Sequence, residues 1–176
     1  DRDDGDGGLD VYTATRAARD ASWSAAVRVT ELSSDNDDLV SSIDETGRTL
    51  LLARRAHDDD SDDDSDDDYD VQIARRTTLA DPWQPPAPLD EINTDDEESD
   101  AFLVGSGLAL IFTRDEDLML SRRVNVDAEF DQGKAIESLN SDDDDRDAWS
   151  DAAFDYVIFS SDRDGTYRLY EAERSR

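Results

Sequence analysis

The hydrophobic residues of this chain fall in short runs that are separated by polar turn residues. Typical runs are Leu50-Leu51-Leu52, Leu110-Ile111-Phe112 and Val157-Ile158-Phe159, each flanked by Gly, Asp, Ser or Thr within a few positions. Short apolar runs rich in branched and aromatic residues and bounded by turn residues are typical of β-strands. Because the runs are too short for helices, the pattern predicts an all-β fold.

The apolar runs belong to an internal repeat. Three segments align without a gap over 39 residues, namely 16–54, 76–114 and 123–161. Each opens with an arginine that is followed seven positions later by an aromatic residue (Trp23, Trp83 and Phe130). The opening arginines are 60 and then 47 residues apart, and the first interval contains an Asp-rich insertion at 57–68. Without this insertion the period is that of a four-stranded propeller blade, about 40 to 50 residues.

Each repeat divides into four predicted strands, which we name A to D from the innermost to the outermost. The A strands are expected at about 39–43, 100–105 and 147–151, and the B strands at about 49–54, 108–113 and 156–161. The C strands are expected at 9–16, 69–76, 117–123 and 167–173, and the D strands at about 26–32, 87–92 and 134–139. Gly47 and Gly107 are suited to the A–B turns, where Phe154 is an exception expected to weaken the third turn.

We therefore expect 1–176 to be one partial β-propeller domain of about three to four antiparallel blades. Its parts are the C and D strands of a leading blade (1–33), a blade with the insertion (34–93), a second blade (94–140) and an incomplete trailing blade (141–176). A propeller needs about four to eight blades to close. The expectation is a fragment that lacks N-terminal blades; an open arc or a ring closed by a second copy are the alternatives.

Two strings carry a resemblance to a known family. Phe159-Ser160-Ser161-Asp162-Arg163-Asp164-Gly165, followed by Tyr167-Arg168-Leu169-Tyr170, resembles the core of TolB-like propeller repeats, a WD-like family rich in Asp-Gly-Arg. Gly47-Arg48-Thr49-Leu50 resembles the turn of the same repeat. The resemblance implies a propeller in a bacterial envelope, periplasmic or secreted setting. It does not imply one function, because a fold hosts many functions.

The acidic residues gather in clusters that the strand order places on one face of the molecule. Three clusters, 35–38, 95–98 and 142–145, fall in the predicted D–A loops, and the runs at 1–6 and 57–68 fall in B–C loops. One interpretation is a solvated surface. The alternatives are a basic partner and Ca²⁺, which prefers six to eight oxygen ligands. The candidate Ca²⁺ ligands are Asp35, Asp37, Asp38, Asp95, Asp96, Asp142, Asp143 and Asp144.

Composition narrows the classes of partner. The chain has 48 Asp and Glu against 18 Lys and Arg, a formal net charge of −30. Such a charge disfavours nucleic acids and anionic membranes and favours cations or a basic protein partner. The excess of Asp is typical of halophilic proteins and equally of GC-rich genomes. There is no cysteine, which excludes disulfides and thiolate metal sites, and no apolar run of about 20 residues that could span a membrane.

Structural roles are expected for the aromatic residues, the repeated arginines and the histidine. The repeated aromatic residues and Trp149 are expected in the core. The repeated arginines are expected to pair with carboxylates or to cap strand ends, with ligand binding as the alternative. His57, the only histidine, lies in the Asp-rich insertion, which is a poor place to orient a catalytic imidazole.

We expect a non-enzymatic binding or scaffold module with no cofactor other than possible Ca²⁺. The alternatives are the propeller domain of a carbohydrate-active or peptidase-associated enzyme, and a calcium-stabilised structural module. Two carboxylates facing one pocket would favour the carbohydrate-active alternative.

Overall fold

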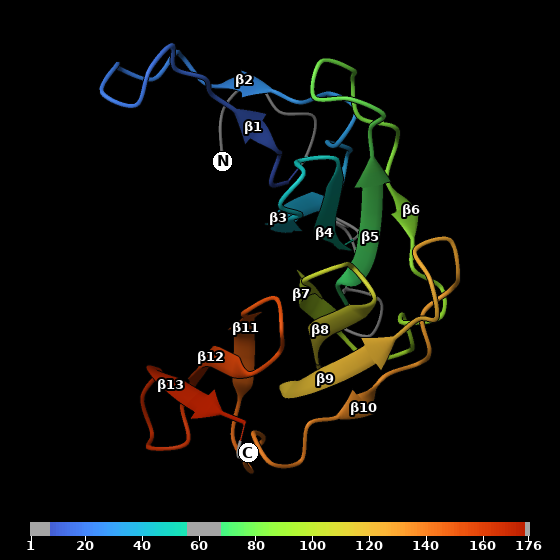
Figure 1. The fold of residues 1–176 in the computed structure, drawn as a ribbon, viewed down its shortest axis with the longest axis vertical. Helices are drawn as coiled ribbons and strands as arrows, with labels where there is room; N and C mark the ends of the chain where they lie inside the picture. The colour runs from blue at the N-terminus through green and yellow to red at the C-terminus, as the bar shows by residue number, and fades with distance from the viewer. Residues whose placement is uncertain (1–7, 56–67, 175–176) are drawn as a thin grey trace.

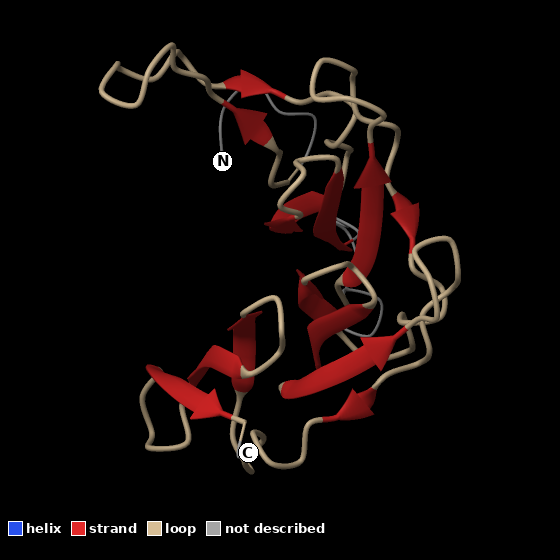
Figure 2. Ribbon diagram, in the orientation of Figure 1, coloured by secondary structure: helices blue, strands red, loops and turns tan. Residues whose placement is uncertain are grey.

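The computed structural model describes residues 8–55 and 68–174, which form strands and loops only (Figure 2). Sheet I pairs β1 (Tyr12–Thr13) with β2 (Val27–Arg28). Sheet II contains β3 (Asp37–Ile43), β4 (Thr49–Arg55), β5 (Asp70–Arg75) and β6 (Ala87–Pro88). Sheet III contains β7 (Glu98–Val104), β8 (Ala109–Arg114), β9 (Asp117–Arg122) and β10 (Lys134–Ala135). Sheet IV contains β11 (Asp145–Ser150), β12 (Tyr156–Ser161) and β13 (Arg168–Glu173).

The all-β prediction is therefore confirmed. In the described ranges there is no helix, and so none long and apolar enough to cross a membrane. Within every sheet, each strand pairs antiparallel with its neighbour in sequence. Each set of predicted strands A to D therefore forms one sheet, and the aligned segments 16–54, 76–114 and 123–161 each run from the end of one sheet into the next.

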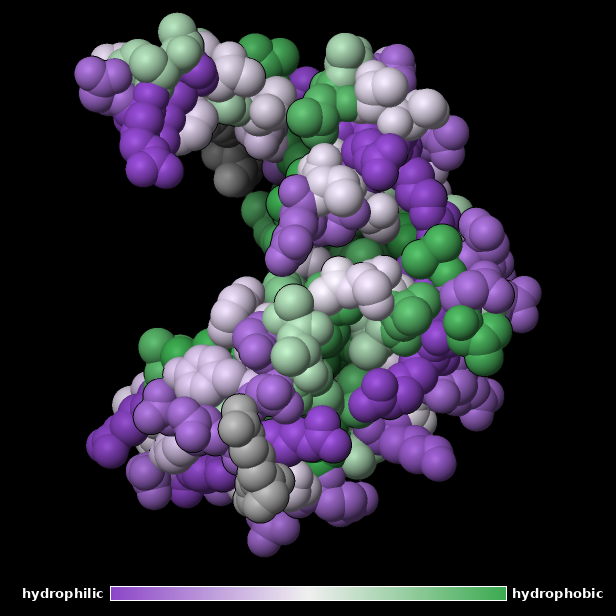
Figure 3. Space-filling view, viewed as in Figure 1, coloured by the Kyte–Doolittle hydropathy of each residue, from purple (hydrophilic) through white to green (hydrophobic). Residues whose placement is uncertain are grey.

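The four sheets follow one another along an arc (Figure 1). The first strands of sheets II, III and IV, which are β3, β7 and β11, lie on the concave side, while β6 and β10 lie on the outer side. Contacts of β7 with both β3 and β11 confirm that these inner strands are neighbours. The concave side is an open hollow in the space-filling view (Figure 3).

Neighbouring sheets pack face to face, so that the central sheets bury both faces. Alternate residues of β4 point to opposite sides, with Leu51 in the cluster between sheets II and III and Leu50 and Leu52 in the cluster between sheets I and II. Likewise, Phe112 on β8 packs toward sheet II, whereas Ile111 packs toward sheet IV. The period of two along a strand thus distributes one apolar run between two cores.

The predicted strands are present, but several boundaries were wrong. The inner strands begin two residues earlier than predicted, so that the last acids of all three clusters belong to β3, β7 and β11. The predicted D strands shrink to two residues each, because the chain turns soon after pairing. The amides of Leu32, Ile92 and Leu139 donate to the carbonyls of Val29, Leu89 and Ile136, three residues back. The leading C strand was predicted at 9–16, but β1 pairs only at Tyr12 and Thr13.

The three A–B turns share a positive φ at one aligned position. Gly47 and Gly107 have φ values of 66° and 74°, as predicted, and Phe154 adopts 56° at the same place. In the first and third turns an aspartate accepts two backbone amides, Asp44 from Arg48 and Thr49 and Asp151 from Asp155 and Tyr156. These hydrogen bonds hold the third turn in place although a non-glycine residue is disfavoured at positive φ.

A buried acid at the start of each inner strand joins its sheet to the preceding one. Asp38, Glu98 and Asp145 are 3%, 0% and 0% exposed. Their amides donate to the carbonyls of Leu9, Tyr69 and Glu116 in the preceding repeat, at 2.7, 2.7 and 2.8 Å. The same contact therefore recurs at every junction between sheets.

The side chain of each acid completes what we call an inter-sheet clamp. The carboxylate accepts the amide and hydroxyl of a Ser or Thr four residues earlier and is paired with an arginine from the second strand of its sheet or just beyond it. This arginine also donates to a backbone carbonyl of the preceding repeat. The sets of hydroxyl residue, acid, arginine and carbonyl are Ser34, Asp38, Arg54 and Leu32; Thr94, Glu98, Arg114 and Ile92; and Ser141, Asp145, Arg163 and Leu139.

The third clamp takes its arginine from a different position. Ser161 occupies the place that aligns with Arg54 and Arg114, and Arg163 reaches back from the following turn. The Nε of Arg163 donates to the Ser161 hydroxyl at 2.9 Å, which orients the guanidinium. Burial alone would raise the pKa of Asp145, but hydrogen bonds from Ser161, Arg163 and Ser141 lower it below the ordinary value. The buried carboxylate therefore remains charged.

We predict that Arg114→Met destabilises the protein by about 3–5 kcal/mol, because it leaves the buried Glu98 carboxylate without its counter-ion. The added change Glu98→Gln should recover much of this loss, since the uncompensated charge is then gone. The control Arg168→Met removes a 64% exposed side chain and should change stability by less than about 0.5 kcal/mol. Urea unfolding measures all three variants, and a loss at Arg114 no larger than at Arg168 would contradict the clamp.

Candidate functional site

The inner strands share an irregularity that faces the concave side. The register of each with its neighbour shifts at the same aligned place, between Val40 and Ser42 in β3, between Ser99 and Phe102 in β7, and between Arg146 and Trp149 in β11. A β-bulge bends its strand and re-aims the side chains beside it. Three bulges in a row therefore set the shape of the inner surface.

Two aspartates occupy the bulges of sheets III and IV. Asp100 and Asp147 align in the repeat and have φ values of 50° and 56°, in the left-handed region. Asp is among the few non-glycine residues that adopt this conformation readily. In the first repeat the aligned residue is Val40, which is 49% exposed.

These residues line a hollow of about 390 Å³ across the three inner strands, which we call the inner-strand site. Its wall combines the two aspartates with apolar side chains, chiefly Val40, Ile43, Phe102 and Trp149. Hydrophobic residues border the concave side next to β3 in Figure 3. A few polar groups within an apolar wall are the usual composition of a small binding site.

Trp149 is the largest side chain of the inner-strand site. The indole lies 6.3 Å from the ring of Phe102 and 6.5 Å from that of Tyr156, measured between centroids. Although these contacts hold it, 47% of the residue stays exposed. Our prediction of Trp149 as a core residue was therefore wrong, because the bulge beside it turns the side chain to the concave surface.

The electrostatics of the site depend on the two carboxylates. Burial raises the pKa of Asp100, and the negative charge of Asp147 raises it further. Arg146 and hydrogen bonds from Thr113 and Ser99 lower it only in part. The site is thus an acidic and partly apolar surface, which suits a cationic group flanked by hydrophobic ones.

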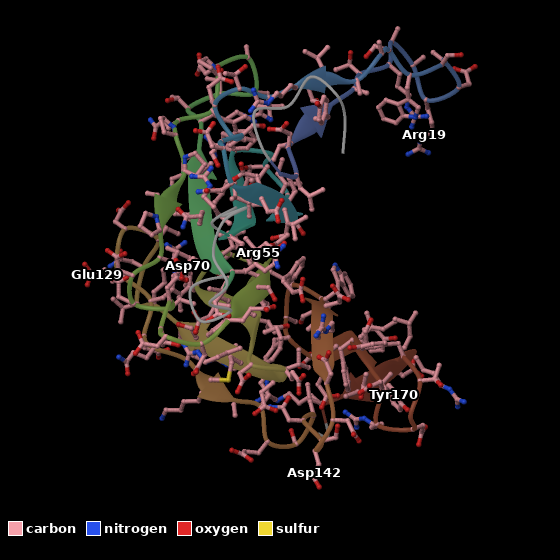
Figure 4. All side chains as sticks on the ribbon, turned by 180° about the vertical axis from the view of Figure 1, so that it is seen from behind. Arg19, Arg55, Asp70, Glu129, Asp142 and Tyr170 are labelled. Atoms are coloured by element: carbon pink, nitrogen blue, oxygen red, sulfur yellow. The ribbon has the colours of Figure 1, made fainter. Side chains whose placement is uncertain are left out.

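The eight candidate Ca²⁺ ligands fall into two groups. Asp35, Asp95, Asp96, Asp142 and Asp143 are exposed on loops, and Figure 4 shows Asp142 at the edge of the molecule, pointing outward. Asp37, Asp38 and Asp144 are buried and form ion pairs with Arg55, Arg54 and Arg146. The sequence clusters are therefore split between solvent and the junctions between sheets.

Asp144 shows how completely a buried member of a cluster is engaged. It accepts hydrogen bonds from the Arg146 guanidinium and the Tyr167 hydroxyl. The bond to Asp144 raises the pKa of Tyr167 to about 12. Within 8–55 and 68–174 no group of three or more His, Asp or Glu is arranged to hold a metal ion. The Ca²⁺ sites stay a prediction.

The repeated arginines stack on the repeated aromatic residues. The guanidinium carbons of Arg16, Arg76 and Arg123 lie 4.5, 4.3 and 4.4 Å from the ring centroids of Trp23, Trp83 and Phe130. Phe130 is buried as predicted and Trp83 is half-buried, but Trp23 is 61% exposed, so its assignment to the core was wrong. Sheet I has only two strands beside Trp23 to cover it.

Other predicted features lie outside the described residues. These are His57 and nearly all of the Asp-rich insertion, and the acidic run at 1–6.

Sequence reasoning missed the two aspartates of the inner-strand site. The signal was present, because Asp100 and Asp147 align with each other and each precedes an apolar stretch of an inner strand. Both are the first residues of the strands predicted at 100–105 and 147–151, and an acid at the start of a strand is common. Only the earlier start of β7 and β11 places them within the strands, at the bulges.

Comparison with known proteins gave no match, whether with family models, curated proteins or solved structures. The resemblance to TolB-like repeats therefore stays a prediction.

We predict that Asp147→Asn lowers the pKa of Asp100, because it removes the neighbouring negative charge. Carbon-detected NMR titration of the aspartate carboxyl groups measures this shift, and Asp95→Asn in an exposed loop is the matched control. An unchanged Asp100 titration in Asp147→Asn would contradict the coupling.

The raised pKa of Asp100 also predicts a pH-dependent stability. The fold disfavours the charged form of Asp100. The contribution of this carboxyl group to the free energy of unfolding is therefore complete below the ordinary aspartate pKa of about 3.9, and it is lost as pH rises through the folded-state pKa. Asp100→Asn should therefore melt higher than the wild type at pH 7, with the difference vanishing as pH falls below about 3.9.

Proposed function

We propose that the chain is a set of β-propeller blades and that it acts as a non-enzymatic binding module. Its partner is a basic protein segment that carries hydrophobic residues beside its cationic groups, held at the inner-strand site. The observation that carries this proposal is the recurrence of bulged inner strands that present Trp149, Val40 and Ile43 together with Asp100 and Asp147.

Several features support the propeller. Each repeat makes one antiparallel meander, the first strand lies on the concave side, and successive sheets pack face to face along an arc. These are the properties of blades arranged around a central channel. The resemblance to TolB-like repeats points the same way and implies an envelope or secreted location.

The chemistry of the site supports a basic and partly apolar partner. Two aspartates, one of them partly desolvated, would attract an arginine or lysine. The exposed face of Trp149 offers stacking to a guanidinium and apolar contact to a neighbouring side chain. Aromatic side chains in pockets commonly dominate the binding energy of protein interfaces.

The test uses a fluorescein-labelled decapeptide of alternating arginine and leucine, with fluorescence anisotropy as the readout. Trp149→Ala should weaken binding by about tenfold, the effect of losing one well-packed aromatic contact. Trp23→Ala is the matched control, because Trp23 is also exposed but lies on a loop of the N-terminal sheet. Asp147→Asn should weaken binding as well.

A second peptide of alternating arginine and serine keeps the guanidinium groups but lacks the apolar side chains. It should bind more weakly than the leucine peptide, and Trp149→Ala should weaken its binding by a smaller factor, because only the stacking on a guanidinium is lost. Equal losses for Trp149→Ala and Trp23→Ala with the leucine peptide would contradict the proposal.

One observation favours a second candidate function, glycoside hydrolysis. Asp100 has a raised pKa and lies beside a second carboxylate in a hollow with an exposed tryptophan, which resembles the acid and nucleophile of a glycosidase. Under this alternative the protein hydrolyses at least one of a panel of 4-nitrophenyl glycosides, and Asp100→Asn abolishes the reaction. The binding-module proposal expects no hydrolysis across the panel.

A further inference from the structure

The arginines of the described chain divide into two groups by their partners. Six lie within 3 Å of a carboxylate and are at least partly buried: Arg28, Arg54, Arg55, Arg114, Arg146 and Arg163. By contrast, seven described arginines form no ion pair with any described carboxylate: Arg16, Arg19, Arg48, Arg75, Arg76, Arg122 and Arg123. In a chain with 48 acids and 18 bases, unpaired arginines are unexpected and need a reason.

Four of the unpaired arginines gather at one junction, between sheets II and III. Arg75 ends β5 and Arg76 follows it, Arg123 follows the last residue of β9, and Arg48 lies in the A–B turn of sheet II. A hollow of about 530 Å³ at this junction is lined by Arg48, Arg75, Arg76 and Arg123. An adjoining hollow of about 390 Å³ shares Arg75 and Arg123.

Two of these guanidinium groups are held rigidly. The Nε of Arg76 donates to the Gly47 carbonyl at 2.8 Å, and the Nε of Arg123 donates to the Gly107 carbonyl at 2.7 Å. Each is also stacked on its aromatic residue, as described above. Such a guanidinium is held by a hydrogen bond at Nε and by the ring that stacks on its plane. Its terminal nitrogens can therefore donate to a ligand with little further loss of side-chain entropy.

The glycines of the two A–B turns lie beside the arginines of this junction. A Cβ atom at Gly47 or Gly107 would lie 3.6 or 3.4 Å from Nη2 of Arg76 or Arg123, which is an ordinary contact distance. The positive φ described above, rather than the neighbouring guanidinium, therefore favours glycine at these turns.

The larger hollow carries a small excess of positive charge, with four arginines against three carboxylates. Burial lowers the pKa of Arg123, and the charge of Arg75 lowers it further, whereas Asp127 opposes this. Three carboxylates line the larger hollow, Asp44, Glu45 and Asp127. Asp44 is engaged by the amides of Arg48 and Thr49 and by the hydroxyl of Thr46.

We propose that this junction is a binding site for an oxyanion group, a phosphate or a carboxylate, of a small-molecule ligand. Guanidinium forks match the spacing of two oxygens on such groups. A hollow of this size accommodates a small molecule. The site lies at the ends of β5 and β9, the third strands of their sheets, on different residues from the inner-strand site. It does not depend on the function proposed there.

The test is an NMR titration of the wild-type chain with sodium phosphate and, separately, sodium citrate, each at constant ionic strength. The Nε–H signals of Arg76 and Arg123 should shift in a saturable way with a Kd below about 10 mM. Those of the clamp arginines Arg54 and Arg114 should not shift. Saturation by phosphate alone identifies a phosphate ligand, saturation by citrate alone a carboxylate, and saturation by both a general oxyanion site.

Two variants separate the site from the net charge. Arg75→Gln should weaken binding by about tenfold, because it removes one charge-assisted contact. Arg168→Gln, which removes an exposed arginine of sheet IV, should leave binding unchanged, and so should Trp149→Ala. Absence of saturable shifts with both anions, or equal weakening by Arg75→Gln and Arg168→Gln, would overturn the proposal.

Discussion

The structure depends on a buried ion pair that is repeated at each junction between sheets. Asp38, Glu98 and Asp145 are nearly or fully removed from solvent, yet each keeps an arginine and a hydroxyl partner. A buried carboxylate tolerates few alternative arrangements, because any loss of its partners leaves an unpaired charge in a medium of low polarity. The clamp therefore fixes the register of one sheet against the next, while the apolar clusters supply most of the burial.

The clamp also determines which surfaces remain for binding. The most buried acids and their arginines form the clamps at one end of the sheets, where the inner strands begin. The bulges follow within a few residues and turn Asp100, Asp147 and Trp149 toward the concave side. Four arginines without carboxylate partners, Arg48, Arg75, Arg76 and Arg123, line the junction between sheets II and III, beside the A–B turns. An acidic chain thus presents an acidic, partly apolar inner surface and a separate cationic junction.

Much of the fold could be predicted from the sequence, because the repeat and the two-residue period are both visible in it. The A–B turns at Gly47 and Gly107 follow from the same pattern, and the all-β class does too. The clamps could not be predicted, because the sequence of an acidic cluster is the same whether its acids face solvent or a guanidinium. The third clamp hides its arginine at Arg163, two residues beyond the aligned position.

The candidate site was not predictable by alternation alone. One extra residue in a strand reverses the side on which every following side chain lies. Trp149 was expected in the core because it is an aromatic residue of an inner strand, but the bulge turns its side chain outward. The tryptophan is exposed at 47%, and the aspartate two residues before it adopts a left-handed conformation.

Amide hydrogen exchange tests the clamp most directly. The amides of Asp38, Glu98 and Asp145 donate across the junctions to the preceding repeat, so all three should exchange as slowly as the central amides of β4 and β8. The amide of Asp96, in an exposed loop of the same cluster, should exchange far faster. Rapid exchange of the three clamp amides, at the rate of Asp96, would contradict the account.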